Sequence, residues 1–126
     1  MAQFLSEQWI DDLAMAAAGT TIDPEVDLVV QQVVVGQGGS DDVTYALRLR
    51  DGKVEVAAGR AEDADITFTQ DRETAADIAS GRLPAQAAFM AGRLRVAGDL
   101  RTVLARARDL GSLDDILASA RATTTW

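Results

Sequence analysis

The sequence contains no cysteine and no histidine. The absence of cysteine excludes disulfides, thiolate metal sites and cysteine nucleophiles. The absence of histidine removes the commonest general base and a common metal ligand, so neither Ser-His-Asp nor Cys-His catalysis can be built. We therefore expect no metal ion, no other cofactor and no enzymatic activity, and we expect a protein that holds a molecule rather than changes one.

Aromatic residues are also scarce, at 5% of the chain, although 48% of the residues are hydrophobic. Aliphatic side chains and alanine must therefore fill most of the core. A chain of 126 residues has the usual size of one domain, and we expect a single domain over residues 1–126. No apolar run reaches the roughly 18 residues of a membrane span, and the N-terminal segment carries acids where a signal peptide carries bases. The sequence therefore predicts a soluble cytoplasmic protein.

Basic residues are missing from the first 47 positions, which hold eight acidic residues, and the net charge of the chain is −8. In contrast, the segment from Arg82 to Arg108 holds six arginines against one acidic residue, Asp99. The acidic total argues against nucleic-acid binding. The simplest interpretation of the arginine-rich segment is a solvated strand and helix face. The alternative is weak contact with an anionic membrane surface or an acidic partner.

The first half of the chain predicts one helix followed by strands. Trp9 and Leu13 belong to an amphipathic pattern that predicts a helix ending near Gly19 and covering one face of a sheet. Four short segments are typical of strands, because they are rich in β-branched residues or alternate between apolar and polar side chains. They are residues 28–35, 43–49, 54–56 and 66–68. Asp51-Gly52 is a hairpin signal, and four successive strands with short connections predict an antiparallel meander.

The second half of the chain predicts mostly helices, as judged from caps, prolines and apolar spacing. The segments are a helix from Thr69 or Asp71, a short helix over 84–90, a strand over 94–96, and helices from Asp99 and Ser112. The fold class that we expect is α+β, with a mostly antiparallel sheet of about five strands covered by helices on one face.

Motifs between residues 64 and 99 follow one another in a recognisable order. A strand with the sequence ADITFT (64–69) leads to a helix that ends at Ser80-Gly81 and then to a proline-containing short helix with Ala88-Phe89. A glycine and a basic, alternating strand complete the pattern at 92–99. In this order the motifs resemble the second half of the sterol carrier protein 2 family, the small lipid-binding domains. Arginine stands here where lysine is common in the family, and the Gln31-Gln32 strand matches nothing specific in it.

The resemblance implies an apolar tunnel enclosed between the sheet and the helices, in which family members hold sterols, fatty acids, acyl-coenzyme A or phospholipids. From it we expect a ligand to contact a set of mostly apolar side chains. They are Trp9, Leu13, Val33, Tyr45, Leu47, Phe68, Ile78, Gln86, Phe89, Met90, Leu94, Val96, Leu104 and Ile116. The alanines around Phe89 and Met90 either leave room for a ligand or let a helix pack closely on the sheet.

Polar groups are needed only to orient one end of such a ligand. Gln86 and Gln32 are candidates, and the alternative for each is a surface or backbone-bonding glutamine. Trp126 either covers a tunnel mouth or lies at a frayed terminus.

Three functions compete at this point. The first is a carrier of a lipid or other hydrophobic small molecule, acting as a monomer or a dimer. The second is a small enzyme or accessory subunit that acts on a hydrophobic molecule through a carboxylate of raised pKa or through Tyr45. The third is an interaction module whose apolar face meets a protein partner. Because the chain lacks histidine and cysteine, we favour the carrier.

Overall fold

The structure, a computed structural model, describes residues 2–125 except 23, 37–41, 99–100, 102–115, 117, 119 and 122–123. Its elements are β1 (Ala2–Gln3), α1 (Glu7–Ala18), β2 (Leu28–Val35), β3 (Val43–Arg50), β4 (Lys53–Ala58), β5 (Ile66–Asp71), α2 (Arg72–Ala79), α3 (Ala85–Met90), β6 (Leu94–Gly98) and β7 (Thr124–Thr125). The main sheet has the strand order β4-β3-β2-β5-β6. The expected fold class, an α+β fold with a five-stranded and mostly antiparallel sheet, is confirmed.

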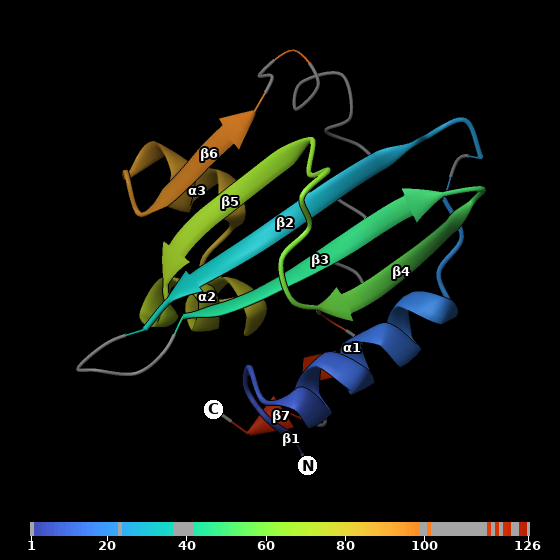
Figure 1. The fold of residues 1–126 in the computed structure, drawn as a ribbon. Coiled ribbons are helices and arrows are strands. Elements are labelled where there is room, and N and C mark those ends of the chain that lie inside the picture. Colours follow the sequence, from blue (N-terminus) through green and yellow to red (C-terminus); the bar gives the residue numbers. More distant parts are fainter. Residues whose placement is uncertain are drawn as a thin grey trace.

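The strand order corrects one expectation, because the four successive strands do not form a meander. After β4 the chain crosses the sheet, and β5 pairs with β2 in parallel, whereas the other neighbours are antiparallel. The crossing connection runs in front of β3 and β2 in Figure 1. It is fixed at Asp65, whose N–H donates to the Val29 carbonyl (2.9 Å) and whose carboxylate accepts from the Val29 N–H (2.8 Å). A short connection along the chain therefore does not decide which strands are neighbours.

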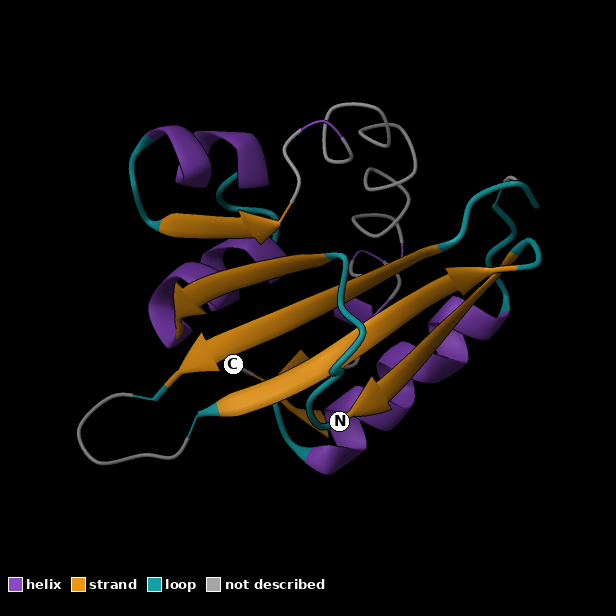
Figure 2. Ribbon diagram, turned by 45° about the horizontal axis from the view of Figure 1, so that its top comes forward, coloured by secondary structure: helices purple, strands orange, loops and turns teal. Residues whose placement is uncertain are grey.

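The helices α1 and α2 lie on one face of the sheet and the crossing connection lies on the other (Figure 2). We call these the inner face and the outer face. The main hydrophobic core lies between the inner face and the two helices, and the large side chains that are fully buried belong to it. They include Trp9, Leu13, Val26, Val30, Leu49, Ile66 and Ile116. A smaller apolar cluster of Val29, Ala46 and Ala61 lies under the crossing connection on the outer face.

Local signals fix the ends of several elements. Ser6 caps α1, since its hydroxyl accepts a backbone N–H of the first turn at 3.2 Å. Asp71 caps α2 by accepting the Thr74 N–H at 2.7 Å, which confirms the start predicted there. The β3–β4 hairpin turns through Asp51 and Gly52, which have φ angles of 55° and 77°, as a type I′ turn requires.

Close packing requires one of the glycines. Gly98 ends β6 with a φ of 122° and is the register partner of Ile66. A Cβ at this position would clash with the Asp65 carbonyl oxygen. The crossing connection and the last strand of the sheet can therefore meet here only because residue 98 has no side chain.

The two ends of the chain lie together, which the sequence did not predict. β1 and β7 form a parallel pair, and the Phe4 N–H donates to the Thr125 carbonyl at 2.8 Å. The helices expected from Asp99 and Ser112 lie mostly outside the described residues, as does Trp126. The described residues in these segments that are helical are Arg101, Ile116, Ala118, Ala120 and Arg121.

Candidate functional site

The inner face carries an aromatic cluster of Phe4, Trp9 and Tyr45. The rings of Phe4 and Trp9 meet edge to face with centroids 4.9 Å apart, and those of Trp9 and Tyr45 meet in the same way at 5.7 Å. The Trp9 indole N–H donates to the Thr124 hydroxyl at 3.2 Å. Edge-to-face pairs are favourable geometries for aromatic rings. The cluster therefore joins α1 to β3 and to the C-terminal strand, and it holds the Tyr45 ring in place.

Two glutamine side chains meet beside this cluster. Gln32 is the register partner of Tyr45 on β3 and of Phe68 on β5, so the three side chains share the inner face. Gln70 Nε2 donates to Gln32 Oε1 at 2.8 Å, and Gln70 is buried. One hydrogen bond between two amides leaves an NH₂ group on one and a carbonyl on the other available. The inner face thus holds polar groups with spare capacity among apolar side chains.

Tyr45 adds a neutral hydroxyl to these amides. Burial raises the pKa of Tyr45 well above its ordinary value, because an apolar environment disfavours the phenolate. Its hydroxyl makes no hydrogen bond with another residue in the described part of the chain. Tyr45 can therefore donate or accept a hydrogen bond, but it is poorly suited to act as a base at neutral pH. We call Gln32, Gln70 and Tyr45 the polar triad.

The structure brings together most of the side chains that the sequence predicts to contact a ligand. Those buried in the main core or packed against it are Trp9, Leu13, Tyr45, Leu47, Phe68, Val96 and Ile116. Leu94 is buried and is the register partner of Gln70, and Ile78 on α2 is partly buried. Leu104 lies outside the described residues. Contact of these side chains with a ligand stays a prediction.

Four predicted residues lie elsewhere. Val33 points to the outer face, because it follows Gln32 and successive strand residues alternate between faces. Gln86, Phe89 and Met90 are exposed on α3, with Phe89 50% and Met90 79% exposed. The physical reason is the shortness of α3, which buries a single residue, Ala88. The inner wall expected around Phe89 and Met90 is therefore not where these side chains lie.

Gln70 is not among the residues predicted from the sequence, although the sequence carries a signal for it. Gln70 stands two residues after Phe68 and four after Ile66, and both of these belong to the inner face. Alternate residues of a strand lie on the same face, so a polar residue at the same alternation as inner-facing apolar residues is a candidate for an internal site. The same alternation distinguishes Gln32 from Gln31 on β2.

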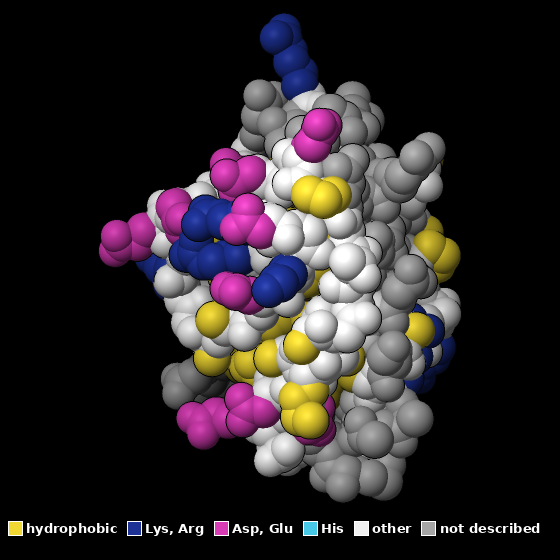
Figure 3. All heavy atoms as spheres, turned by 90° about the vertical axis from the view of Figure 1, so that its right-hand side faces the viewer, with side chains coloured by type: hydrophobic (Ala, Val, Ile, Leu, Met, Phe, Trp, Pro, Cys, Tyr) yellow, Lys and Arg dark blue, Asp and Glu magenta, His cyan; other side chains and the backbone are white. Residues whose placement is uncertain are grey.

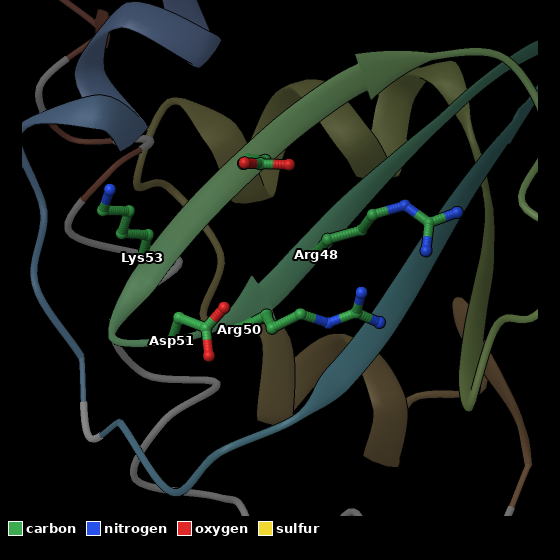
Figure 4. Close-up of a pocket in the computed structure, with 5 residues that line it drawn as sticks. Arg48, Arg50, Asp51 and Lys53 are labelled. Carbon is green, nitrogen blue, oxygen red and sulfur yellow. The ribbon is translucent and has the colours of Figure 1, made fainter.

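A charged groove of about 240 Å³ lies at the β3–β4 hairpin (Figure 4). It is lined by Arg48, Arg50, Asp51, Lys53 and Glu55. Arg48 donates to both carboxylate oxygens of Asp63 at 2.8 and 2.9 Å, and Arg50 pairs with Asp27 at 3.4 Å. Acidic and basic side chains are intermixed on this side of the molecule (Figure 3). Since its arginines are neutralised and its lining is charged, the groove does not suit an apolar ligand.

The described residues hold no group of three or more acidic side chains placed to bind a metal ion. None of the described helices combines the length and the apolar character that crossing a bilayer requires. The inner face, where the polar triad lies among apolar side chains, is the candidate site.

Comparison with known proteins decides the family. The sequence model of the SCP-2 sterol transfer family matches residues 5–109. The chain belongs to the SCP-2 sterol transfer family. The SCP-2 match spans Trp9 and Tyr45 of the aromatic cluster, the polar triad and the segment whose motifs resemble the family. No curated protein sequence matches the chain.

Solved structures share the SCP-2 fold at low sequence identity. A conserved hypothetical protein from Thermus thermophilus has a TM-score of 0.74 at 19% identity, covering 98% of this chain and 91% of that one. A crystal structure of sterol carrier protein 2 has a TM-score of 0.71 at 21% identity, covering 94% and 97%. A sec-alkylsulfatase from Pseudomonas sp. has a TM-score of 0.50 at 20% identity over 85% of this chain, but over only 14% of its own chain. At these identities the likeness shows the fold alone.

Proposed function

We propose that this SCP-2 family member binds a hydrophobic small molecule against the inner face of the sheet and carries it without chemical change. The ligand classes are a fatty acid, an acyl-coenzyme A, a sterol or a phospholipid. The observation that carries the proposal is the polar triad, whose unused hydrogen-bonding groups lie among apolar side chains. Membership of the SCP-2 sterol transfer family supports the same conclusion.

The polar triad would bind the polar end of the ligand. Gln70 is buried and Gln32 is partly buried, so an unused amide group there gains more from a partner than the same group in water. Tyr45 lies next to Gln32 across the β2–β3 pair. A hydroxyl, ester or carboxyl group could then hydrogen-bond to both strands at once.

Burial of the apolar part of the ligand supplies most of the affinity. A chain of about fifteen methylenes offers up to ~12 kcal/mol at ~0.8 kcal/mol per CH₂ group. Association and the ordering of the chain offset a large part of this free energy. Binding in the micromolar range is therefore attainable without a buried ion pair, which is suitable for a carrier that must also release its ligand.

Chemistry at this site is the alternative, and the residues present disfavour it. The described inner-face positions of the five strands hold no aspartate or glutamate. The raised pKa of Tyr45 keeps its hydroxyl neutral. An accessory subunit beside a catalytic domain would bind its ligand at the same inner-face site. The carrier is therefore the function that the geometry supports best.

The test is displacement of fluorescent probes from delipidated protein. We expect a fluorescent fatty acid or a fluorescent sterol to bind in the micromolar range. The double variant Gln32→Leu/Gln70→Leu should weaken binding about tenfold, because one or two hydrogen bonds to the polar end are lost while the apolar contacts remain.

The matched control is Gln86→Leu, which changes an exposed glutamine on α3 and should leave the affinity unchanged. Native mass spectrometry of the purified protein shows whether a lipid is already bound. Failure of both probes to bind, with no lipid seen by mass spectrometry, would contradict the proposal.

A further inference from the structure

The β6 edge of the sheet leaves two large apolar side chains in water. Met90 is 79% exposed and Phe89 is 50% exposed, and they are consecutive residues of α3. The neighbouring Ala85, Ala87 and Ala91 are exposed as well. Large apolar side chains that gather on one exposed element indicate a surface that meets another apolar phase.

The charged residues that flank α3 in the sequence are all basic. The chain has no acidic residue between Ser80 and Gly98, whereas Arg82 precedes α3 and Arg93 and Arg95 follow it. Arg93 pairs with Asp77 at 3.0 Å, but Arg82 and Arg95 are exposed and form no ion pair with the described residues. An apolar helix between unpaired arginines complements an anionic lipid surface, which offers acyl chains beneath negative headgroups.

The opposite edge of the sheet, where α1 and β4 lie, differs in charge, because α1 exposes acidic side chains and no basic ones. There α1 contacts β4 and presents the exposed acidic residues Glu7 and Asp11. Figure 1 shows α1 with β4 and α3 with β6 at opposite edges of the sheet. With a net charge of −8 the protein as a whole is repelled by anionic lipid. Because that repulsion is screened over about 8 Å at physiological salt, only the edge nearest the bilayer determines the contact.

We propose that α3 and its flanking arginines, Arg82 and Arg95, form a docking surface for anionic bilayers, with Phe89 and Met90 entering the headgroup region. This inference goes beyond the proposed function, because docking requires no ligand on the inner face. The partner that we propose is a lipid surface rather than a protein, because two large apolar side chains between arginines match acyl chains and anionic headgroups without a shaped groove. The contact is reversible, as two apolar residues and two cations are a weak anchor.

The experiment is flotation of the whole protein with vesicles. We expect the protein to float with mixed vesicles of phosphatidylcholine and phosphatidylglycerol, and not with phosphatidylcholine alone. Binding should fall steeply as salt is raised toward about 1 M, where the screening length is about 3 Å. The variant Phe89→Ser/Met90→Ser should bind about tenfold more weakly. Arg82→Gln and Arg95→Gln should each weaken binding about fivefold.

Two controls match these variants. Met15 on α1 is 74% exposed, so Met15→Ser removes the same kind of side chain at the acidic edge and should not change flotation. Arg60→Gln removes an exposed arginine from the crossing connection and should not change it either. Thermal unfolding shows that each variant is folded, and Met90→Ser alone serves if Phe89→Ser unfolds the protein.

Three outcomes would overturn the proposal. The first is equal flotation with neutral and anionic vesicles or with neither. The second is an equal loss of flotation in Met15→Ser. The third is a dimer in light scattering that Met90→Ser dissociates, since a second copy would then cover the surface. Probe displacement from the inner face is measured separately, so failure of docking is distinguishable from failure of the carrier function.

Discussion

Strand β2 places two consecutive glutamines on opposite faces of the sheet, and their surroundings differ. On the outer face, Gln31 uses both ends of its amide. Its Oε1 accepts from the Ala61 N–H at 2.8 Å, and its Nε2 lies 3.5 Å from the Thr67 hydroxyl. On the inner face, Gln32 makes one hydrogen bond, to Gln70 at 2.8 Å.

This difference is consistent with a structural role for Gln31 and with the binding role that we propose for Gln32. The outer-face glutamine, Gln31, accepts a hydrogen bond from a backbone N–H of the crossing connection. This connection carries the chain over β2 to the position where β5 pairs with β2. The inner-face glutamines satisfy each other in part and keep groups available for a ligand. Every fully buried side-chain nitrogen and oxygen of the described residues has a hydrogen-bond partner, so the unused amide groups of Gln32 and Gln70 reach space that a ligand can enter.

The largest effect on stability should come from disrupting the side-chain packing on the inner face. Trp9→Ala removes the central ring of the aromatic cluster, which is 1% exposed, and should lower the free energy of unfolding by about 3–5 kcal/mol. Urea denaturation measures the loss. Met15→Ala on the exposed side of α1 is the control and should change stability by less than about 0.5 kcal/mol. A loss below about 1 kcal/mol in Trp9→Ala would mean that the cluster does not hold the inner face together.

The two faces can be compared directly by leucine substitution. Gln31→Leu leaves the buried Ala61 N–H without its acceptor and should destabilise the protein by about 1–3 kcal/mol. The double variant Gln32→Leu/Gln70→Leu removes both partners of one hydrogen bond and should be close to neutral in urea denaturation. Probe binding should respond in the opposite way: the double variant should weaken it, and Gln31→Leu should not. Equal destabilisation on both faces would show that the inner pair is structural as well.

The phenol of the inner face gives a third comparison, in alkaline solution. The pKa of Tyr45 is raised by burial above its unfolded value of about 10, so the folded state favours the neutral phenol. This contribution to stability is complete below pH 10 and is lost as pH rises from there toward the pKa of the folded state. Above pH 10 the free energy of unfolding should fall by up to about 1.4 kcal/mol per pH unit.

Tyr45 is the only tyrosine of the chain, so it supplies the only phenol that can ionise in this range. Tyr45→Phe should remove most of the loss between pH 10 and the highest pH tested, whereas Lys53→Arg should leave it in place. Urea midpoints at successive pH values measure both slopes. A slope unchanged in Tyr45→Phe would mean that the phenol is not as buried as the structure has it.

Most elements of the fold follow from local signals. Alternation and β-branched residues predict β2 and β3, Asp51-Gly52 predicts the hairpin, and Asp71 predicts the start of α2. The partner of β5 could not be predicted in the same way. Its choice of β2 depends on contacts between residues far apart in sequence, such as the hydrogen bonds of Asp65 with Val29. Local patterns in a single sequence do not identify which distant segments pair.

The candidate site was predicted less completely than the fold. Helical and strand periodicity identified Trp9 and Tyr45 as inner residues, and both are buried there. Phe89 and Met90 were expected inside because the family resemblance implies a ligand tunnel lined by this apolar segment. Periodicity over six residues does not say which side of a short helix is covered, and α3 covers only Ala88. Hydrophobicity alone therefore cannot distinguish a cavity wall from an exposed docking surface.

The smallest predicted effect concerns the N-terminal cap of α2, the helix that lies over part of the inner face. Asp71→Ala removes the cap of α2 and should cost about 1 kcal/mol of unfolding free energy at neutral pH. The Thr74 backbone N–H, and then its hydroxyl, hold the pKa of Asp71 below its usual range. The stabilisation by Asp71 is therefore present above its unfolded pKa of about 4 and is lost as pH falls through the folded pKa.

Urea midpoints at neutral and acid pH give the matched measurement. The difference between the wild type and Asp71→Ala should shrink as the carboxyl is protonated, and Asp71→Asn, which keeps an acceptor oxygen, should lose only a few tenths of a kcal/mol. A difference that persisted in acid would assign the effect to the alanine itself rather than to the carboxylate. None of these substitutions should change probe binding by more than the loss of folded protein, because Asp71 lies outside the polar triad. If Asp71→Ala did weaken binding in fully folded protein, the ligand site would have to extend beyond the inner face to the end of α2.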